Sequence, residues 1–326
     1  LLKKFYCKTN QLKFKKIEYF YPLFLKMFRL LIWFFCAPFF FSFSQENKGN
    51  SYVDVNYFKG YVPLHNPDIL HLIKGRPEGT LIAWNQRTDG QKEWHRHYNY
   101  PDYGASFMFL DFQNPVLGKA YGFYGHFNFY FLKRRMMLRV GQGVVISSNP
   151  YDKNSNPKNI AFGSKLLASP YLMLNYKKSN LIGPLGIQSG LLLFHASNGN
   201  IKAPNTSVNT VAFNIGLNYD LGSKEIIPEY LPEEVFISEG LKINLVFRSG
   251  LNQISVVGGS QFPFYTFSVY ADKRFNFFSA FQFGFEASFS QALKEEINYR
   301  SVAFPETPSD SNADYRRIGT FLGYEL

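Results

Sequence analysis

A histidine and a serine stand two residues apart at the end of an apolar segment, as His195 and Ser197. In an extended strand, residues two apart project from the same face. A histidine beside a serine hydroxyl is the smallest pair that can perform nucleophilic acyl transfer, because the histidine takes the proton as the serine attacks a carbonyl. Such a short pattern also occurs by chance, so the surrounding sequence must support it.

The residues before this pair alternate between two classes of side chain, and the odd-numbered ones are mainly aliphatic. They are Leu185, Ile187, Ser189, Leu191 and Leu193. We expect this row to face lipid. A histidine and a serine at the end of such a row are out of place as packing residues, which favours a chemical role for them.

The same period of two recurs in segments of roughly ten residues from about Thr80 onward, which indicates β-strands. In residues 277–289, for example, most odd positions are Phe and most even positions are small or polar. The expected strands are 80–89, 103–113, 121–132, 136–147, 164–176, 185–197, 207–219, 240–249, 263–272, 277–290 and 315–325. A further strand near 51–59 makes twelve, an even number as in single-chain bacterial barrels, and eight or ten remain open.

The N-terminal part contains the one continuous apolar run, Leu30–Ser44, which follows Met27 and Arg29. A short basic region, an apolar region and small residues before the cleavage point are typical of a secretory signal peptide. We therefore expect a signal peptide in 27–44, cut near Ser44, and read 1–26 as upstream translation that is not native. Residues 45–79 are expected to form an irregular lead-in with a possible first strand, and 80–326 the barrel.

These boundaries change the charge and cysteine arguments. Residues 1–44 hold eight of the 35 Lys and Arg and one of the 24 Asp and Glu, which leaves 27 minus 23, or +4. Nucleic-acid binding therefore has no support. Both cysteines, Cys7 and Cys36, also lie in the discarded part, so the mature chain forms no disulfide.

A soluble β-sandwich would also alternate with a period of two, so the alternation alone does not choose between the two fold classes. The chain contains 36 Phe and 22 Tyr, and one aromatic face is repeated along many strands. Such a surface is prone to aggregation in water but suits lipid. With the secretory signal, this predicts an all-β, antiparallel transmembrane β-barrel of about twelve strands (eight to twelve) in the outer membrane of a Gram-negative bacterium.

The sequence after the pair adds a resemblance to a known family. Residues 194–205 read Phe-His-Ala-Ser-Asn-Gly-Asn-Ile-Lys-Ala-Pro-Asn, and a strand ending in 214–219 follows. This resembles the lipid A deacylase (PagL-like) family of outer-membrane acyl hydrolases, whose signature is His-x-Ser-Asn, Lys-x-Pro-Asn and a later Gly-x-x-Tyr-like strand. Further blocks are similar to the longer relatives of acyloxyacyl hydrolase type: Trp84, 89–90, Trp94, 98–101, 117–118 and 156–163.

The resemblance implies a carboxylic ester hydrolase that removes acyl chains from lipid A, lipopolysaccharide or a related outer-membrane lipid. Ser197 would be the nucleophile and His195 the general base. The oxyanion would be stabilised by Asn198 and by backbone N–H groups near Gly199 and Asn200.

The chain departs from the family at the acidic residue, because the expected Glu falls at Asn209 or Thr210. If the hairpin pairs Ser197 opposite Asn209, the 209, 211, 213 row shares the lipid-facing side, and Asn209 reaches His195. Asparagine can orient a neutral imidazole but offers no formal negative charge. Asp220 and Glu225 are the nearest downstream acids, and neither is obviously on the right face.

No cofactor or metal is expected. Residues 94–97 contain a His-x-His spacing, but no further ligand stands nearby, and an aromatic and basic interfacial loop fits them better. His126 is expected to face the interior. The rival function is a non-catalytic barrel, structural or a narrow pore, that keeps the motif as a relic.

Overall fold

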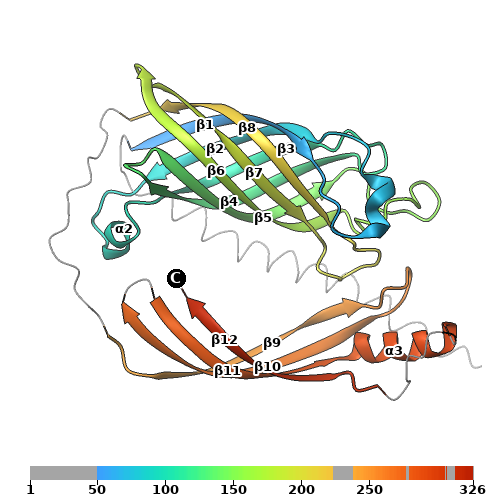
Figure 1. The fold of residues 1–326 in the computed structure, drawn as a ribbon. Helices are drawn as coiled ribbons and strands as arrows, with labels where there is room; N and C mark the ends of the chain where they lie inside the picture. The colour runs from blue at the N-terminus through green and yellow to red at the C-terminus, as the bar shows by residue number, and fades with distance from the viewer. Residues whose placement is uncertain (1–49, 223–237, 277–278, 305, 307–312, 326) are drawn as a thin grey trace, which may run out of the picture. The chain divides into compact units, whose positions relative to one another are not determined.

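The computed structural model describes residues 50–222, 238–276, 279–304, 306 and 313–325. The expected signal peptide and the segment before it lie outside this range. Two β structures make up the described part: a closed barrel and a separate open sheet (Figure 1). Among these residues, no helix is both long and apolar enough to cross a membrane.

The barrel consists of eight antiparallel strands, each paired with its neighbour in sequence. The strands are β1 (Ser51–Tyr61), β2 (Glu78–Arg87), β3 (Asp102–Asp111), β4 (Lys119–Phe131), β5 (Met136–Ser147), β6 (Leu166–Ile182), β7 (Leu185–Ala196) and β8 (Val208–Asp220). The first and last strands close it, in a register that runs from Tyr52 opposite Asp220 to Tyr61 opposite Val211. Two short helices, η1 (Pro67–Leu72) and α2 (Glu93–His97), lie in its connections.

The remaining strands form a four-stranded antiparallel sheet in sequence order. They are β9 (Lys242–Gln253), β10 (Gln261–Asn276), β11 (Ser279–Ser290) and β12 (Arg316–Glu325), and the helix α3 (Gln291–Ala303) connects the last two. All twelve predicted strands are present. The number of barrel strands is at the lower limit of the predicted eight to twelve. The closed barrel has eight strands and spans 51–220, and the other four strands form the open sheet.

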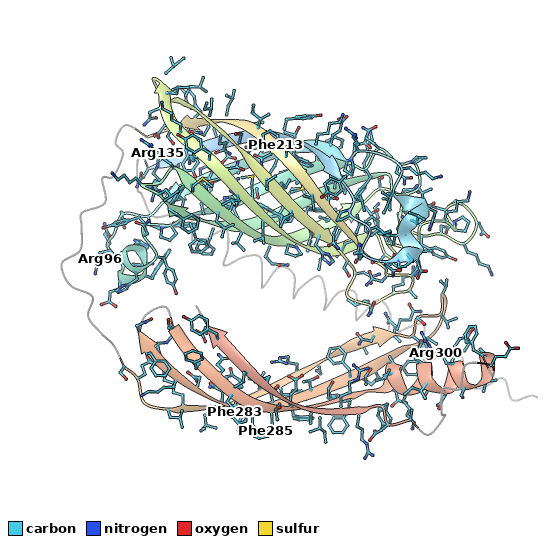
Figure 2. All side chains as sticks on the ribbon, in the orientation of Figure 1. Arg96, Arg135, Phe213, Phe283, Phe285 and Arg300 are labelled. Atoms are coloured by element: carbon cyan, nitrogen blue, oxygen red, sulfur yellow. The ribbon has the colours of Figure 1, made fainter. Side chains whose placement is uncertain are left out.

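Side chains alternate between the outside and the lumen of the barrel, as predicted. The odd-numbered row from Leu185 to Leu193 and the row from Val211 to Leu217 point outward, and Phe213, labelled in Figure 2, is 58% exposed. Gln188 and Asn214 are buried in the lumen. An exterior of aliphatic and aromatic side chains around a polar interior is the pattern of an outer-membrane barrel.

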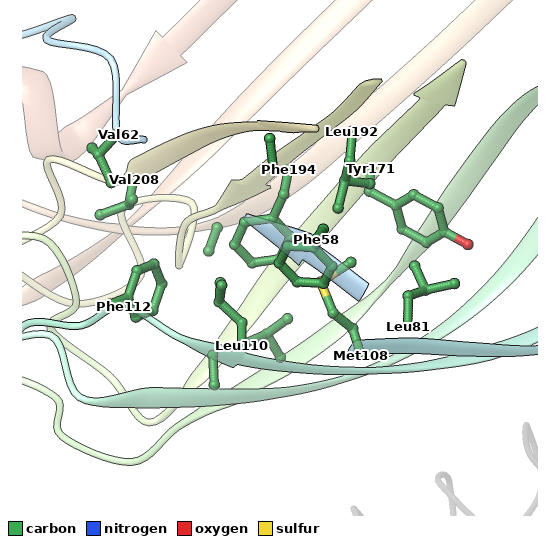
Figure 3. Packing of buried hydrophobic residues seen from close by; sticks show 14 of the residues in the cluster. Phe58, Val62, Leu81, Met108, Leu110, Phe112, Tyr171, Leu192, Phe194 and Val208 are labelled. Carbon is green, nitrogen blue, oxygen red and sulfur yellow. The ribbon is translucent and has the colours of Figure 1, made fainter. Parts of the chain in front are cut away.

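Side chains fill the lumen. One half holds the apolar cluster of Figure 3, which includes Phe58, Leu110 and Phe194. The other half is polar, and an ion pair between Arg139 and Asp54 (2.6 Å) lies there with both side chains fully buried. His126 Nε2 donates to Asn85 Oδ1 (2.9 Å) in the same network, and its burial confirms the predicted interior position. An eight-stranded barrel has an interior just wide enough for such filling.

The two ends of the barrel differ in their connections. At the end where β7 stops, the connections are residues 62–77, 112–118, 148–165 and 197–207. At the other end they are 88–101, 132–135 and 183–184, and both barrel termini lie there. Outer-membrane barrels place short turns on the periplasmic side and long loops outside. By this rule, we expect the end that carries His195 and Ser197 to be the extracellular one.

Candidate functional site

His195 is the last residue of the outward row of β7, and it stands directly opposite Asn209 of β8. The two half-buried side chains contact each other, with His195 Nδ1 2.7 Å from Asn209 Oδ1. The expected contact is therefore present. The expected register was two residues out, since His195 and not Ser197 stands opposite Asn209.

The contact defines the proton positions of the imidazole. A carbonyl oxygen can only accept, so Nδ1 must carry the hydrogen and donate it to Asn209 Oδ1. Nε2 of a neutral ring then holds a lone pair and can accept a proton. Within the described residues, no hydrogen bond engages Nε2. This is the arrangement that a general base requires.

Ser197 lies just beyond β7, where its backbone bridges to Ala168 next to the start of β6. Ser197 N donates to Ala168 O (3.1 Å), and Ala168 N donates to Ser197 O (2.8 Å). The pairing of β7 with β8 ends at Ala196, so Ser197 has its bridge partner at the start of β6 and none on β8. Ser197 is half-buried, like His195, on the same side of the chain, but no hydrogen bond between their side chains occurs in the part of the chain that the structure describes.

The hydroxyl of Ser197 is held by the loop of residues 197–207. Its Oγ accepts a hydrogen bond from Gly199 N (3.1 Å) and lies 3.1 Å from Asn205 Nδ2 and 3.3 Å from Asn205 Oδ1. Two N–H groups thus converge on the oxygen that would attack a carbonyl. Donors that close to a nucleophile are well placed to bind the oxyanion that its attack creates.

Asn205 is the centre of this loop and was missing from the residues given a role in the sequence. Besides Ser197, its side chain accepts from Asn198 N (3.0 Å) and donates to Asn200 Oδ1 (3.0 Å). It is the Asn of the Lys-x-Pro-Asn segment. That motif was the available signal, but the folding of the loop back onto Ser197 cannot be read from spacing.

The three residues expected to stabilise an oxyanion have different positions. The Gly199 N–H contacts Ser197 Oγ, whereas the Asn198 side chain is buried and donates to Lys202 O (2.6 Å), inside the loop. Asn200 contacts Ser197 only through Asn205. Gly199 and Asn200 both have a positive φ (64° and 62°), a conformation that Gly and Asn tolerate best.

The alternatives for the acidic residue lie elsewhere. Thr210 is buried in the lumen, on the opposite face of β8 from Asn209. Asp220 is at the far end of that strand and forms an ion pair with Arg87 (2.8 Å). Glu225 lies outside the described residues. Of the candidates that the structure describes, Asn209 is the one in contact with His195.

The His-x-His spacing of residues 94–97 is the metal alternative that the sequence raised. The described part of the chain contains no group of three or more His, Cys, Asp or Glu side chains that could hold a metal ion. His95 of the His-x-His segment contacts Asp89 instead (3.1 Å).

Two comparisons with known proteins concern this region of the chain. A search of curated proteins found no match to the chain. Residues 78–218 match the family described as lipid A 3-O-deacylase (PagL). The match begins with β2 and ends in β8, so it includes His195, Ser197, Asn205 and Asn209. This match supports a PagL-like lipid A deacylase, in agreement with the resemblance seen in the sequence.

Proposed function

We propose that this protein is an outer-membrane ester hydrolase that removes an acyl chain from lipid A or a related outer-leaflet lipid. Ser197 is the nucleophile, His195 the general base, and Asn209 positions His195. The observation that carries this proposal is the 2.7 Å contact between His195 and Asn209, on the lipid-facing wall beside Ser197. Two polar side chains that served only for packing would have no reason to lie on a lipid-facing wall.

In the reaction, the Ser197 hydroxyl turns from Asn205 to His195 Nε2, which takes its proton as Oγ attacks the ester carbonyl. The tetrahedral oxyanion accepts hydrogen bonds from Gly199 N–H and Asn205 Nδ2–H. His195 then gives its proton to the leaving alkoxide, which departs as the deacylated glycolipid. Water, activated by the same imidazole, cleaves the acyl-enzyme and releases a fatty acid and free Ser197.

The surroundings suit a lipid substrate. Leu193 precedes the pair on the same row and is largely exposed, as is Leu166 at the start of β6. An acyl chain can therefore lie along the apolar wall while its ester reaches the extracellular end, where the headgroup layer begins. We further propose that the enzyme is of the acyloxyacyl hydrolase type, which would specify the ester bond.

The rival class is a barrel without catalysis. A narrow pore is disfavoured by the filled lumen, in which Arg139, Phe58 and Tyr171 are fully buried. Measurement of ester hydrolysis separates a purely structural barrel from an enzyme.

The test uses purified, refolded protein with lipid A in mixed micelles, and mass spectrometry of released fatty acid and remaining lipid. Ser197→Ala and His195→Ala should each reduce release by about 10³-fold or more, as with other serine–histidine pairs. Ser189→Ala is the matched control, because Ser189 lies on the outward row of the same strand and is remote from the site. It should leave the rate unchanged.

Full activity of Ser197→Ala would refute the assignment of the nucleophile. A wild-type protein that is inert on every lipid A ester would favour the structural barrel. In that case, lipid A from cells with and without the gene should also be identical by mass spectrometry.

A further inference from the structure

The open sheet β9–β12 has one apolar face, and the side chains on this face are exposed. Ten large apolar side chains on this face are 43–85% exposed: Ile243, Leu245, Phe247, Phe267, Val269, Phe281, Phe283, Phe285, Ile318 and Leu322. The registers place them in rows across all four strands, such as Leu245, Val269 and Phe285. Figure 2 labels two of them, Phe283 and Phe285. A monomeric protein in water rarely exposes so large an apolar area.

Charged and tyrosine side chains on this face stand only at its two ends. At one end, Tyr265, Phe289 and Arg316 follow one another across the strands. At the other end, the corresponding row is Lys273, Phe281 and Tyr324. An apolar band between two aromatic and charged borders is the pattern of a membrane-facing surface.

The opposite face of the same sheet is polar and internally paired. Arg248 forms an ion pair with Glu286 (2.9 Å), and Ser268 donates to the same carboxylate (2.9 Å). Asn244 donates to Asp272, and Thr266 contacts Ser288 (3.1 Å). The barrel β1–β8 has the same division, with its ion pair and amide network inside and aliphatic and aromatic rows outside. The sheet therefore has the two faces of a barrel wall.

The strands are long enough to cross a membrane. They contain 12, 16, 12 and 10 residues, whereas a tilted transmembrane strand needs about 9–11. Yet among the described residues β9 pairs only with β10, and β12 only with β11. Lipid does not tolerate the unpaired N–H and C=O groups of an open edge, so a sheet in the membrane must close.

The barrel of the same chain does not offer an edge for this closure. Its first and last strands are paired with each other over ten positions. The edges β9 and β12 run in opposite directions, because the sheet is antiparallel and has an even number of strands. Thus β12 of one copy and β9 of another, both in the same orientation across the membrane, can pair as antiparallel neighbours.

The orientation of the chain agrees with such an arrangement. The sheet begins at Lys242 and ends at Glu325 on the same side, since both stand opposite residues near the β10–β11 turn. The other side carries the longer connections, residues 254–260 and 291–315, the second of which includes α3. The barrel also has its termini on its short-turn side. Both parts therefore have the topology of outer-membrane proteins.

We propose that copies of this chain join β12 of one to β9 of the next and so build a second, shared antiparallel barrel in the outer membrane. The apolar face is turned to lipid, and the Arg248–Glu286 face is turned inward. Two copies supply eight strands, the number with which this chain closes its own barrel. The proposal does not depend on ester hydrolysis, because it involves none of the residues of that site.

The first test is disulfide cross-linking between copies in outer membranes. One tagged copy carries Ser249→Cys on β9, and a differently tagged copy carries Ile318→Cys, Thr320→Cys or Leu322→Cys on β12, so that the unknown register is sampled. We expect a disulfide-linked pair carrying both tags for at least one combination. Ala287→Cys on the inner strand β11 is the matched control in place of the β12 cysteine and should not cross-link.

The catalytic variant Ser197→Ala should cross-link as well as the wild-type background, which separates failure of this proposal from failure of the proposed function. Absence of the two-tag product from all three combinations overturns the shared barrel. A second outcome would also overturn it. If both cysteines are placed in one chain and a disulfide joins β9 to β12 within a monomeric purified protein, the sheet closes on itself.

The second test asks whether lipid covers the apolar face. Phe283→Lys places a charge on that face, whereas Gln282→Lys places it on the adjacent polar position, near Glu325. In intact outer membranes, we expect Phe283→Lys to lose the cross-link and to make residues 242–325 sensitive to added protease, and Gln282→Lys to do neither. Cleavage of residues 242–325 in the wild type to the same extent as in both variants would show that the sheet is outside the membrane. That result would overturn the proposal.

Discussion

Asn209 Oδ1 lies 2.7 Å from His195 Nδ1, across the hairpin formed by β7 and β8. The amide can hold the ring and fix its tautomer. In the proposed mechanism, however, it cannot offset the charge of the imidazolium that forms when His195 deprotonates Ser197. The related enzymes are expected to use a Glu at this point. The third residue of a serine–histidine site can have two roles, to orient the histidine and to supply a negative charge. Asn209 can have only the first of them.

Substitution of Asn209 tests this separation. Asn209→Ala should lower the rate of deacylation by about 10- to 100-fold, which corresponds to loss of one orienting hydrogen bond of about 1–3 kcal/mol. Asn209→Glu should preserve or raise the rate, because a carboxylate stabilises the imidazolium. The acid limb of the pH–rate profile should also move to higher pH in Asn209→Glu. The added carboxylate favours the protonated imidazole, so a higher pH is needed to free Nε2 as a base. A profile identical to that of the wild type would contradict a contact with a catalytic base.

Asn205 supplies a second prediction. Asn205→Asp keeps the size of the side chain and an acceptor for Asn198 N but removes the N–H group near Ser197 Oγ. We expect kcat to fall by about 10²- to 10³-fold, the usual loss for one oxyanion donor. Thr206→Ala, in the adjacent position, loses a hydrogen bond to Ile160 O but no contact with Ser197, and should keep its kcat.

The ion pair in the lumen predicts a stability effect. Arg139→Ala leaves the carboxylate of Asp54 buried without its cation and should destabilise the barrel by about 3–5 kcal/mol. Urea unfolding in lipid vesicles measures this change. The double variant Asp54→Leu with Arg139→Met, which removes both charges, should recover much of the loss. A double variant less stable than Arg139→Ala would argue that the polar network itself, and not charge balance, stabilises the lumen.

The lipid-facing rows predict a depth-dependent effect. Leu191→Lys places a charge near the middle of β7 on the outer wall and should cost about 2–4 kcal/mol of unfolding free energy. Leu132→Lys, in the turn between β4 and β5, adds the same charge at an exposed end of the barrel and should cost little. Equal effects in vesicles would mean that Leu191 does not face the hydrocarbon layer.

Local pattern was enough to predict the strands but not their closure. Eleven of the twelve strands follow from alternation, and the strand near 51–59 was added because it makes the number even, as in single-chain barrels. Alternation is the same in β1–β8 and β9–β12, however, and the pairing of β1 with β8 joins residues far apart in sequence. No periodic signal reports which distant strands pair, so the division into eight and four strands could not be predicted.

At the site, the outward direction of His195, Ser197 and Asn209 follows from the same alternation. The role of Asn205 does not, because it depends on how residues 197–207 fold back beyond the strand ends. The orientation of Asn198 into the loop likewise results from its hydrogen bond to Lys202 O, which links residues of an irregular segment. Positions within strands were therefore predictable, and contacts within the loop were not.

The outward position of the site determines how the substrate arrives. His195 and Ser197 lie on the outer wall and not in the filled lumen. Under the proposed function, the ester would therefore reach them by lateral diffusion within the leaflet. The rate should then depend on the mole fraction of lipid A in the surface and not on its bulk concentration. Diluting lipid A with inert detergent at constant total lipid A should slow turnover, which is the behaviour of an enzyme that works in two dimensions.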